Sequence, residues 1–233
     1  LNWGLHVIEN KLFKGSPLTK RRTITEEVVE FIRKAILEGH FIKNQQITES
    51  RLSEDFNVSR APVREALREL ANKGLVTHHP NRGYFLREFS IDETEEVCMV
   101  RCALEKMAVK LVIERASDDD INSLAAIVNE MIGELDEAPV EQHASLNDYK
   151  FHQMLCILAK HKCLYDYWSL MADQTSLAIS SINRSFDAAG TGFVGGHQSI
   201  LDAIRSRDVQ SAENLIEEHI LLGVKNLRCS MTS

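Results

Sequence analysis

Residues 48–86 constrain the fold more than any other stretch, because they place two short helical segments on either side of a four-residue turn. The turn is Phe56–Ser59, and its Asn57 tolerates the left-handed backbone that a tight connection between helices requires. Ser59 is a favourable N-cap for the helix that we predict from Arg60 to Lys73. The stretch therefore predicts a helix-turn-helix.

A β-hairpin is predicted directly after this pair of helices. Gly74 ends the second helix, residues 75–79 and 84–86 favour strands, and Pro80–Gly83 has the composition of a turn. Upstream, a further helix is predicted from Thr25, its N-cap, and the first helix of the pair begins at Thr48. Helix, helix, turn, helix and hairpin, in this order, form the plan of a winged helix-turn-helix.

The helix after the turn has a basic face. Arg60, Arg64 and Arg68 recur every four residues and share one side, while the apolar residues Val63, Leu67 and Leu70 lie on another. A helix with arginines near its N-terminus can enter the major groove and bind guanine or phosphate. The wing tip, Arg82-Gly83, suits contact with the minor groove or the DNA backbone. The alternative is a solvated face paired with acidic neighbours, and the turn and the wing around the helix argue against it.

The overall charge hides this basic region. The formal net charge of −7, taken alone, argues against a nucleic-acid partner. Residues 1–90 hold 15 Lys+Arg against 11 Asp+Glu, a balance of +4, whereas residues 91–233 hold 12 against 23, a balance of −11. Such an asymmetry indicates that one half of the chain meets a polyanion.

The second half is helical almost throughout, so the fold class is mainly α. We predict six helices, near residues 92–116, 119–136, 141–160, 163–184, 195–206 and 209–228, with a loop over Gly190–Gly196. The domains expected are a flexible arm over residues 1–23, a winged helix-turn-helix over 24–89, and an all-helical bundle over 92–229. No apolar run reaches the roughly 18 residues of a membrane span, and no secretory signal is recognisable. The five cysteines include no CxxC pair, which favours reduced thiols in a cytoplasmic protein.

Three histidines of this half each share a helical face with apolar residues. Asp148 and His152 are one turn apart, His197 shares its face with Ile200 and Ile204, and His219 lies on the apolar face of the last helix. Taken singly, each is better explained as a hydrogen-bonded core histidine. Together they would cost several kcal/mol if buried unpaired, and a divalent metal would satisfy them all. Imidazole with carboxylate suits zinc, with nickel, manganese or iron as alternatives.

The residues of the winged helix resemble the GntR family of bacterial transcription regulators. The stretch from Leu52 to Leu70, followed by Gly74-Leu75-Val76 and Arg82–Phe85, carries the resemblance, although Asn57 stands where the family has a turn glycine. The resemblance implies operator contacts by Arg60, Arg64 and Gly83, with Arg51 as a further candidate. Including the neighbours on the same helix and wing, the predicted DNA-binding residues are Arg51, Arg60, Arg64, Arg68, Arg82 and Gly83.

The helical half resembles the FCD effector domain of the FadR subfamily. The matches are Arg101 with Leu104-Glu105, Asp148 with Phe151-His152, Gly196-His197 with Ile200, and Ala212 with His219-Ile220. The resemblance implies that Asp148, His152, His197 and His219 hold a metal, and that two further positions on it take a small organic acid or water. It also implies that Arg101 binds the carboxylate of that acid, the alternative being an i,i+4 ion pair with Glu105. The expected protein is a homodimeric repressor, not an enzyme.

The sequence also suggests two other functions and contains one misleading motif. The metal itself could be the signal, which would make the protein a metal sensor. A metal-dependent enzyme of carboxylate metabolism is less favoured, because no inward Glu or His stands free as a general base. Residues 190–195 fit the pattern GxGxxG, but they follow a helix in a helical region, so we do not interpret them as a dinucleotide site. His78 and His79, in the predicted wing, are interpreted as surface residues.

Overall fold

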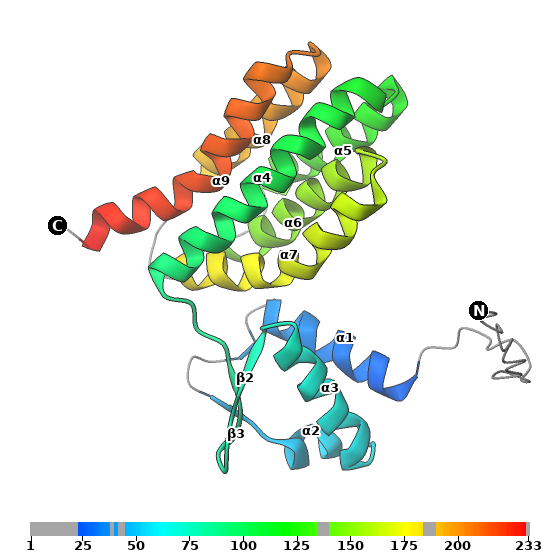
Figure 1. The fold of residues 1–233 in the computed structure, drawn as a ribbon, viewed down its shortest axis with the longest axis vertical. Coiled ribbons are helices and arrows are strands. Elements are labelled where there is room, and N and C mark those ends of the chain that lie inside the picture. Colours follow the sequence, from blue (N-terminus) through cyan, green and yellow to red (C-terminus); the bar gives the residue numbers. More distant parts are fainter. Residues whose placement is uncertain (1–22, 38–39, 42–44, 135–139, 184–189, 232–233) are drawn as a thin grey trace, which may run out of the picture.

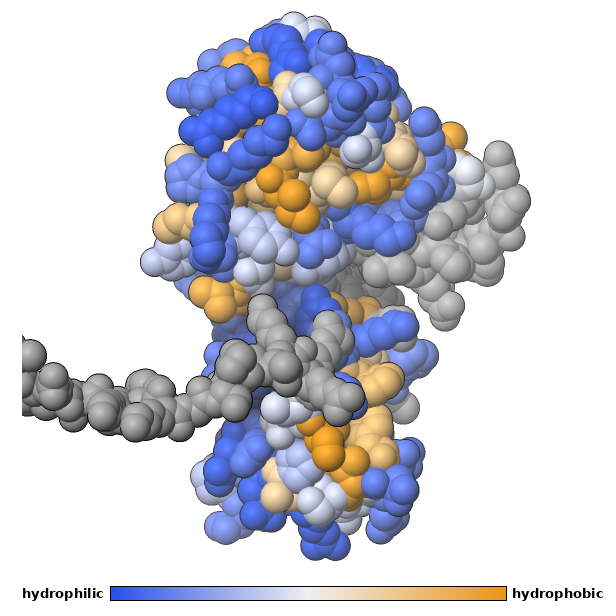
Figure 2. Space-filling model, turned by 90° about the vertical axis from the view of Figure 1, so that its right-hand side faces the viewer, coloured by the Kyte–Doolittle hydropathy of each residue, from blue (hydrophilic) through white to orange (hydrophobic). Residues whose placement is uncertain are grey.

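The fold is a mainly helical chain in two parts, as the sequence predicts (Figure 1). The structure, a computed structural model, describes residues 23–37, 40–41, 45–134, 140–183 and 190–231. We call residues 23–86 the head and residues 91–231 the bundle. In the space-filling view they form two lobes joined at a narrower waist (Figure 2). The predicted arm lies outside the described residues except for Thr23, and no described helix is long and apolar enough to cross a membrane.

The head is a winged helix with its own core. Its elements are α1 (Ile24–Leu37), β1 (Gln46–Ile47), α2 (Glu49–Asp55), α3 (Arg60–Asn72), β2 (Val76–His79) and β3 (Gly83–Leu86). Asn57 has a φ of 52° in the turn between α2 and α3, and Gly74 has a φ of 70° after α3, so both predicted breaks are confirmed. Val63, Leu67 and Leu70 of α3 are fully buried in the core beneath the wing.

The wing has one strand more than the sequence predicts. The antiparallel sheet has the order β1-β3-β2, with Ile47 of β1 opposite Tyr84 of β3. A strand of two residues is too short to show an alternating pattern, so β1 is defined by its partner rather than by its own sequence. The extra strand covers the edge of the hairpin and buries Ile47.

The predicted N-cap of α1 was wrong by two residues. The helix begins at Ile24, and Thr23 rather than Thr25 caps it. The Thr23 hydroxyl accepts from the amide of Glu26 at 3.2 Å, and the Glu26 carboxylate accepts from the amide of Thr23 at 2.7 Å. This reciprocal pair satisfies two amides that a cap at Thr25 would leave open. Thr25 instead donates its hydroxyl to Glu65 of α3 at 3.1 Å.

The bundle contains the six predicted helices within the described residues. They are α4 (Ile91–Arg115), α5 (Asp118–Glu134), α6 (Val140–Leu158), α7 (Lys162–Asn183), α8 (Gly190–Arg205) and α9 (Val209–Met231). Their shared core includes Phe151, Leu155, Ile200 and Ile216. Cys98, Cys102 and Cys156 are buried free thiols, and Cys163 is an exposed one.

The predicted loop over Gly190–Gly196 was wrong, because α8 begins at Gly190. Glycine costs roughly 1 kcal/mol in a helix, so its local preference favours a loop. Packing accounts for at least one of these glycines. A side-chain carbon at Gly196 would lie 2.7 Å from Nδ1 of His219, so the missing side chain lets α8 approach α9 closely. The GxGxxG pattern therefore belongs to the start of a helix, without the strand that a dinucleotide site needs.

Head and bundle are joined by a short connector and by direct contacts. Residues 87–90 form the connector, and Ser90 caps α4 through a capping box with Glu93. Arg33 of α1 forms a bidentate ion pair with Asp173 of α7. Farther along α7, Leu177 packs into the core of the head.

Candidate nucleic-acid interface and candidate metal centre

The three arginines of α3 lie exposed on one face of the head. Arg60, Arg64 and Arg68 all face solvent, while the opposite side of the helix packs into the core. Ser59 occupies the predicted N-cap position with extended backbone, although its side chain makes no capping hydrogen bond. The first amides of α3 are therefore not capped by Ser59 and add to the positive character of this end.

Arg64 is held by an acidic residue of the neighbouring helix. Its Nε lies 3.0 Å from both carboxylate oxygens of Glu49, and its Nη2 lies 2.8 Å from Oε2. The hydrogen bonds from Arg64 lower the pKa of Glu49, and the charges of Arg60 and Arg68 lower it further. Together with one residue each from β2 and β3, this pair lines a groove formed by Glu49, Arg64, Arg68, Ala71, Asn72, His78 and Tyr84.

The wing tip is fixed by β1. Gly83 has a φ of 83°, and the side-chain amide of Gln46 donates to the carbonyl of Arg82 at 2.5 Å. The Arg82 guanidinium lies over the ring of Phe85, 5.4 Å from its centroid. Arg51 of α2 is exposed, and its Nε lies 3.8 Å from Oδ2 of Asp55. His78 and His79 are exposed, as predicted. Gln46 carried no sequence signal, because its role depends on the strand pairing.

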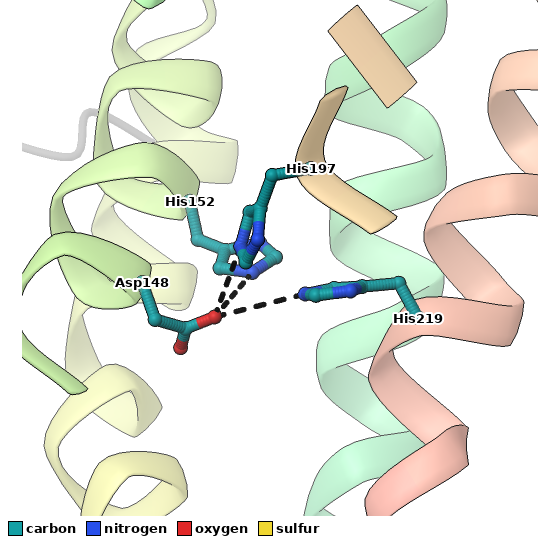
Figure 3. Close-up of side chains that lie close together, drawn as sticks. All are labelled: Asp148, His152, His197 and His219. Carbon is teal, nitrogen blue, oxygen red and sulfur yellow. Dashed lines mark hydrogen bonds and ion pairs between the residues drawn. The ribbon is translucent and has the colours of Figure 1, made fainter. Parts of the chain in front are cut away.

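The four predicted metal ligands converge from three helices (Figure 3). Asp148 and His152 come from α6, His197 from α8 and His219 from α9. Oδ1 of Asp148 lies 3.2 Å from Nε2 of His152, 3.2 Å from Nε2 of His197 and 3.6 Å from Nε2 of His219. One ligand atom from each residue lies within 4.8 Å of all the others. Residues up to 71 positions apart thus present their donor atoms to one small volume.

Burial and charge set the protonation of this cluster. Burial raises the pKa of Asp148, but the three imidazoles outweigh it and hold that pKa well below its ordinary value. For His219, burial lowers the pKa to about 4, and the neighbouring His197 and His152 lower it further. The hydrogen bond to Asp148 raises this pKa but does not outweigh these effects. His219 is therefore neutral near pH 7, which is the form that ligates a metal. An ionised carboxylate with nearby imidazole nitrogens fits a divalent cation of the zinc type.

Arg101 lies beside the cluster, and it makes the ion pair that the sequence offered as the alternative. Its Nε donates to Oε1 of Glu105 at 2.7 Å, and its Nη2 lies 4.0 Å from Oδ2 of Asp148. Glu105 also contacts Nδ1 of His152 at 2.5 Å and accepts from the indole N–H of Trp168 at 2.8 Å. Burial raises the pKa of Glu105, but Arg101 and His152 lower it to about 2, so the carboxylate is ionised.

Sequence reasoning missed the role of Glu105 at this centre. From the sequence, Glu105 was named only among the residues of the FCD resemblance and as a partner of Arg101 one turn away. The contacts to His152 and Trp168 join residues 47 and 63 positions apart, and no local pattern reports such pairs. A glutamate with no exposed side-chain surface is the structural signal, since buried carboxylates require partners.

Known families match both parts of the chain. The model for bacterial regulatory proteins of the gntR family matches residues 24–86, and the FCD domain model matches residues 96–222. The FCD match covers the four converging residues as well as Arg101 and Glu105.

Relatives of similar length match most of this chain. The HTH-type transcriptional repressor RspR of Escherichia coli is 22% identical over 206 residues, which are 87% of this chain and 88% of that protein. A probable D-xylose utilization operon transcriptional repressor of Paenarthrobacter nicotinovorans is 26% identical over 205 residues, 86% of this chain and 87% of that protein. The structure of McbR/YncC of E. coli has the same fold, with a TM-score of 0.76, 18% identity, and coverage of 91% of this chain and 100% of that one.

Proposed function

Since the chain belongs to the GntR family of bacterial regulatory proteins and carries an FCD domain, we propose that a small carboxylate controls its affinity for operator DNA. This carboxylate would bind beside a divalent metal in the bundle. The chain is a DNA-binding transcriptional regulator, and repressors are found among its relatives. Its family consists of regulators rather than enzymes, so no catalytic residue is assigned. We place the DNA-binding domain at residues 24–89 and the effector and dimerisation domain at residues 92–229, with residues 1–23 as an arm.

The convergence of Asp148, His152, His197 and His219 is the observation that carries the metal site. These donors would hold the ion, zinc first among the candidates, with nickel, manganese or iron as alternatives. A bound divalent ion supplies positive charge for a carboxylate oxygen. Arg101, beside the cluster with its Nη2 4.0 Å from Oδ2 of Asp148, supplies a second positive group for the same ligand.

The head would read the operator through α3 and the wing. Arg60, Arg64 and Arg68 face solvent along one side of α3, which suits base edges and phosphates in the major groove. Arg51 on α2 and the wing tip, Arg82 with Gly83, would contact the DNA backbone or the minor groove. On binding, a phosphate or guanine would replace Glu49 as the partner of Arg64.

A homodimer would present two heads to a palindromic operator in the bacterial cytoplasm. The bundle leaves large apolar side chains exposed, among them Met99 and Val100 on α4 and Leu170 on α7, at 59%, 52% and 62% of their surface. A band of apolar residues also crosses the bundle in the space-filling view (Figure 2). Apolar patches of this kind support association with a second copy. The names of the relatives favour repression as the sign of regulation.

Metal content tests the proposed ligand set. We expect wild-type protein to bind zinc after purification in its presence and dialysis, whereas His197→Ala loses it, measured by elemental analysis. His79→Ala, a histidine of the exposed wing, is the matched control and should keep full zinc content. A His197→Ala protein with wild-type zinc content would exclude this site.

Operator binding separates the proposed signals. Metal-stripped protein is titrated with zinc and then with a panel of small carboxylates, while binding is followed on a duplex that the wild-type protein selects from a random library. Release of DNA that needs both zinc and a carboxylate supports the proposal. Release by zinc alone identifies a metal sensor, and consumption of a carboxylate identifies an enzyme.

A further inference from the structure

We infer that Glu105 is a positioning residue that fixes the tautomer of His152 and the direction of Arg101, so that one buried carboxylate prepares both the metal ligand and the arginine that meets the effector. This inference rests on the proposed metal site and deepens it. Glu105 is buried within the bundle, and neither its side chain nor that of His152 has exposed surface. It therefore acts on the site through the protein interior.

The contact with His152 determines which of its nitrogens is free. Nδ1 of His152 lies 2.5 Å from Oε2 of Glu105, and Nε2 lies 3.2 Å from Oδ1 of Asp148. A metal ligand must offer a nitrogen without a proton, so Nδ1 has to carry the proton of the neutral ring. A carboxylate accepts that proton's hydrogen bond and leaves Nε2 free, facing the other ligands.

The other oxygen of Glu105 orients Arg101 and anchors α7. Oε1 accepts from Nε of Arg101 at 2.7 Å and from the indole N–H of Trp168 at 2.8 Å. With Nε occupied, the terminal nitrogens of Arg101 remain on the side of Asp148, where Nη2 lies 4.0 Å from Oδ2. Glu105 thus directs the guanidinium towards the place where an effector carboxylate would lie.

Only a carboxylate can satisfy all three donors. In Glu105→Gln, an amide oxygen facing His152 leaves the NH₂ group against the N–H groups of Arg101 and Trp168. The reverse orientation places the NH₂ group against Nδ1 of His152, which must then give up its proton to Nε2. That ring can no longer offer Nε2 to a metal. An isosteric change therefore tests the charge and the tautomer without changing the packing volume.

Zinc affinity is the first readout. Competition against a chromophoric chelator should show that Glu105→Gln binds zinc roughly 10- to 100-fold more weakly than wild type, the usual effect of removing a partner behind a metal-bound histidine. Trp168→Phe removes one donor to Glu105 while keeping an aromatic ring, and its zinc affinity should stay within about threefold. A folded Glu105→Gln with wild-type zinc affinity overturns the inference. So does a Trp168→Phe protein that loses as much affinity as Glu105→Gln, because packing would then explain both.

The tautomer provides a second readout that does not need the variant to fold. Nitrogen NMR of zinc-loaded ¹⁵N-histidine wild-type protein at pH 8 should show His152 with its proton on Nδ1 and its Nε2 bound to zinc. A proton on Nε2 overturns the inference. Failure of the proposed function has a different signature, because the wild-type protein would then bind no zinc while the tautomer could still be determined.

A second inference concerns the contact between bundle and head, and a different set of contacts carries it. We propose that Arg33 of α1 transmits occupancy of the metal site to the head. Its Nε and Nη2 donate to Asp173 at 2.7 and 2.6 Å, and its Nη2 donates to the hydroxyl of Tyr149 at 3.3 Å. Tyr149 directly follows the metal ligand Asp148 on α6, and its ring contacts that of Trp168 at a centroid distance of 5.7 Å. A shift of α6 on occupation of the metal site would therefore reach Arg33 through the single side chain of Tyr149.

Linkage between the loaded metal site and DNA tests this route. In zinc-loaded wild-type protein, the carboxylate of the panel that releases DNA most effectively should change the affinity for the selected duplex by about fivefold or more. In Arg33→Gln that ratio should fall to within twofold of one, and Tyr149→Phe, which loses only a hydroxyl, should lower it in the same direction. Glu30 is the other carboxylate paired with Arg33, and it is exposed and lies on α1 itself. As the control, Glu30→Gln should keep the wild-type ratio. A wild-type ratio of one, or an unchanged ratio in Arg33→Gln, overturns the proposal.

Discussion

Arg64 and Glu49 form an ion pair at the place where a phosphate or a base edge would arrive. About half of the Arg64 side chain is exposed, 51%, against 26% for Glu49. Pairs with this exposure contribute little to stability, because water screens the two charges. Exchange of Glu49 for DNA therefore costs little, while the pair holds the guanidinium beside Glu49 of α2 in the free protein.

Loss of the Arg64 side chain should weaken operator binding. We expect Arg64→Ala to lower affinity for the selected duplex by about 1–3 kcal/mol, the usual contribution of an arginine that contacts a base edge, with the melting temperature nearly unchanged. Fluorescence anisotropy measures the affinity. Arg205→Ala, which removes an exposed arginine of the bundle, serves as the control. Equal affinities for both variants would remove Arg64 from the interface.

At the scale of elements, Gly74 ends α3 where the head meets α7. Its φ of +70° is unfavourable for other residues, and a side-chain carbon there would lie 2.8 Å from Nη1 of Arg87 and 2.9 Å from Nε2 of Gln174. Gly74→Ala should therefore lower the free energy of unfolding by more than about 1 kcal/mol, measured by denaturant titration. Gly133→Ala is the matched control. It adds a carbon to α5 with nothing within 4 Å, and it should stabilise the protein.

The start of α5 should respond to acid. Asp120 accepts from Lys160 and from the amide of Ser117, and these two hydrogen bonds lower its pKa to about 2. A carboxyl whose pKa is lower in the folded than in the unfolded chain stabilises the fold above its unfolded value, near 3.8. That contribution is lost as the pH falls towards 2. The difference in melting temperature between wild type and Asp120→Asn should therefore shrink from pH 6 to pH 3, and a constant difference would contradict this assignment.

Elements with local causes were predictable from the sequence, and those with distant causes were not. The turn at Asn57, the end of α3 at Gly74 and the inward faces of His152, His197 and His219 all follow from spacing within one segment. Strand β1 depends on β3, and the first turns of α8 contradict the local preference of glycine. At the candidate metal centre, the proposed ligand set came from helical faces together with the family resemblance. The contact between Glu105 and His152 required the fold itself.

For the whole molecule, metal removal should lower the stability of the folded protein. Four ligands from α6, α8 and α9 would link three helices of the bundle, and the unfolded chain has no such site. Zinc at about 100 times its dissociation constant would stabilise the folded protein by roughly 2.7 kcal/mol. We expect chelation to lower the melting temperature and zinc to restore it. His197→Ala should show no response to zinc, whereas a full response in that variant would place the bound zinc elsewhere.

The connector between head and bundle is hydrogen-bonded at both ends, so it would be the pivot of any rotation of the head. Its four residues reach at most about 14 Å. The amide of Arg87 is bonded to the carbonyl of Leu75, and Ser90 caps α4, so a rotation of the head would turn about this point and would have to move the Arg33–Asp173 ion pair as well. The far end of α3, at Arg60, lies roughly 20 Å along the helix from the end near the connector. A turn of about 10° there moves Arg60 by roughly 3.4 Å, the rise of one base pair. A small rotation at the waist is thus enough to shift the head by one position along a DNA groove.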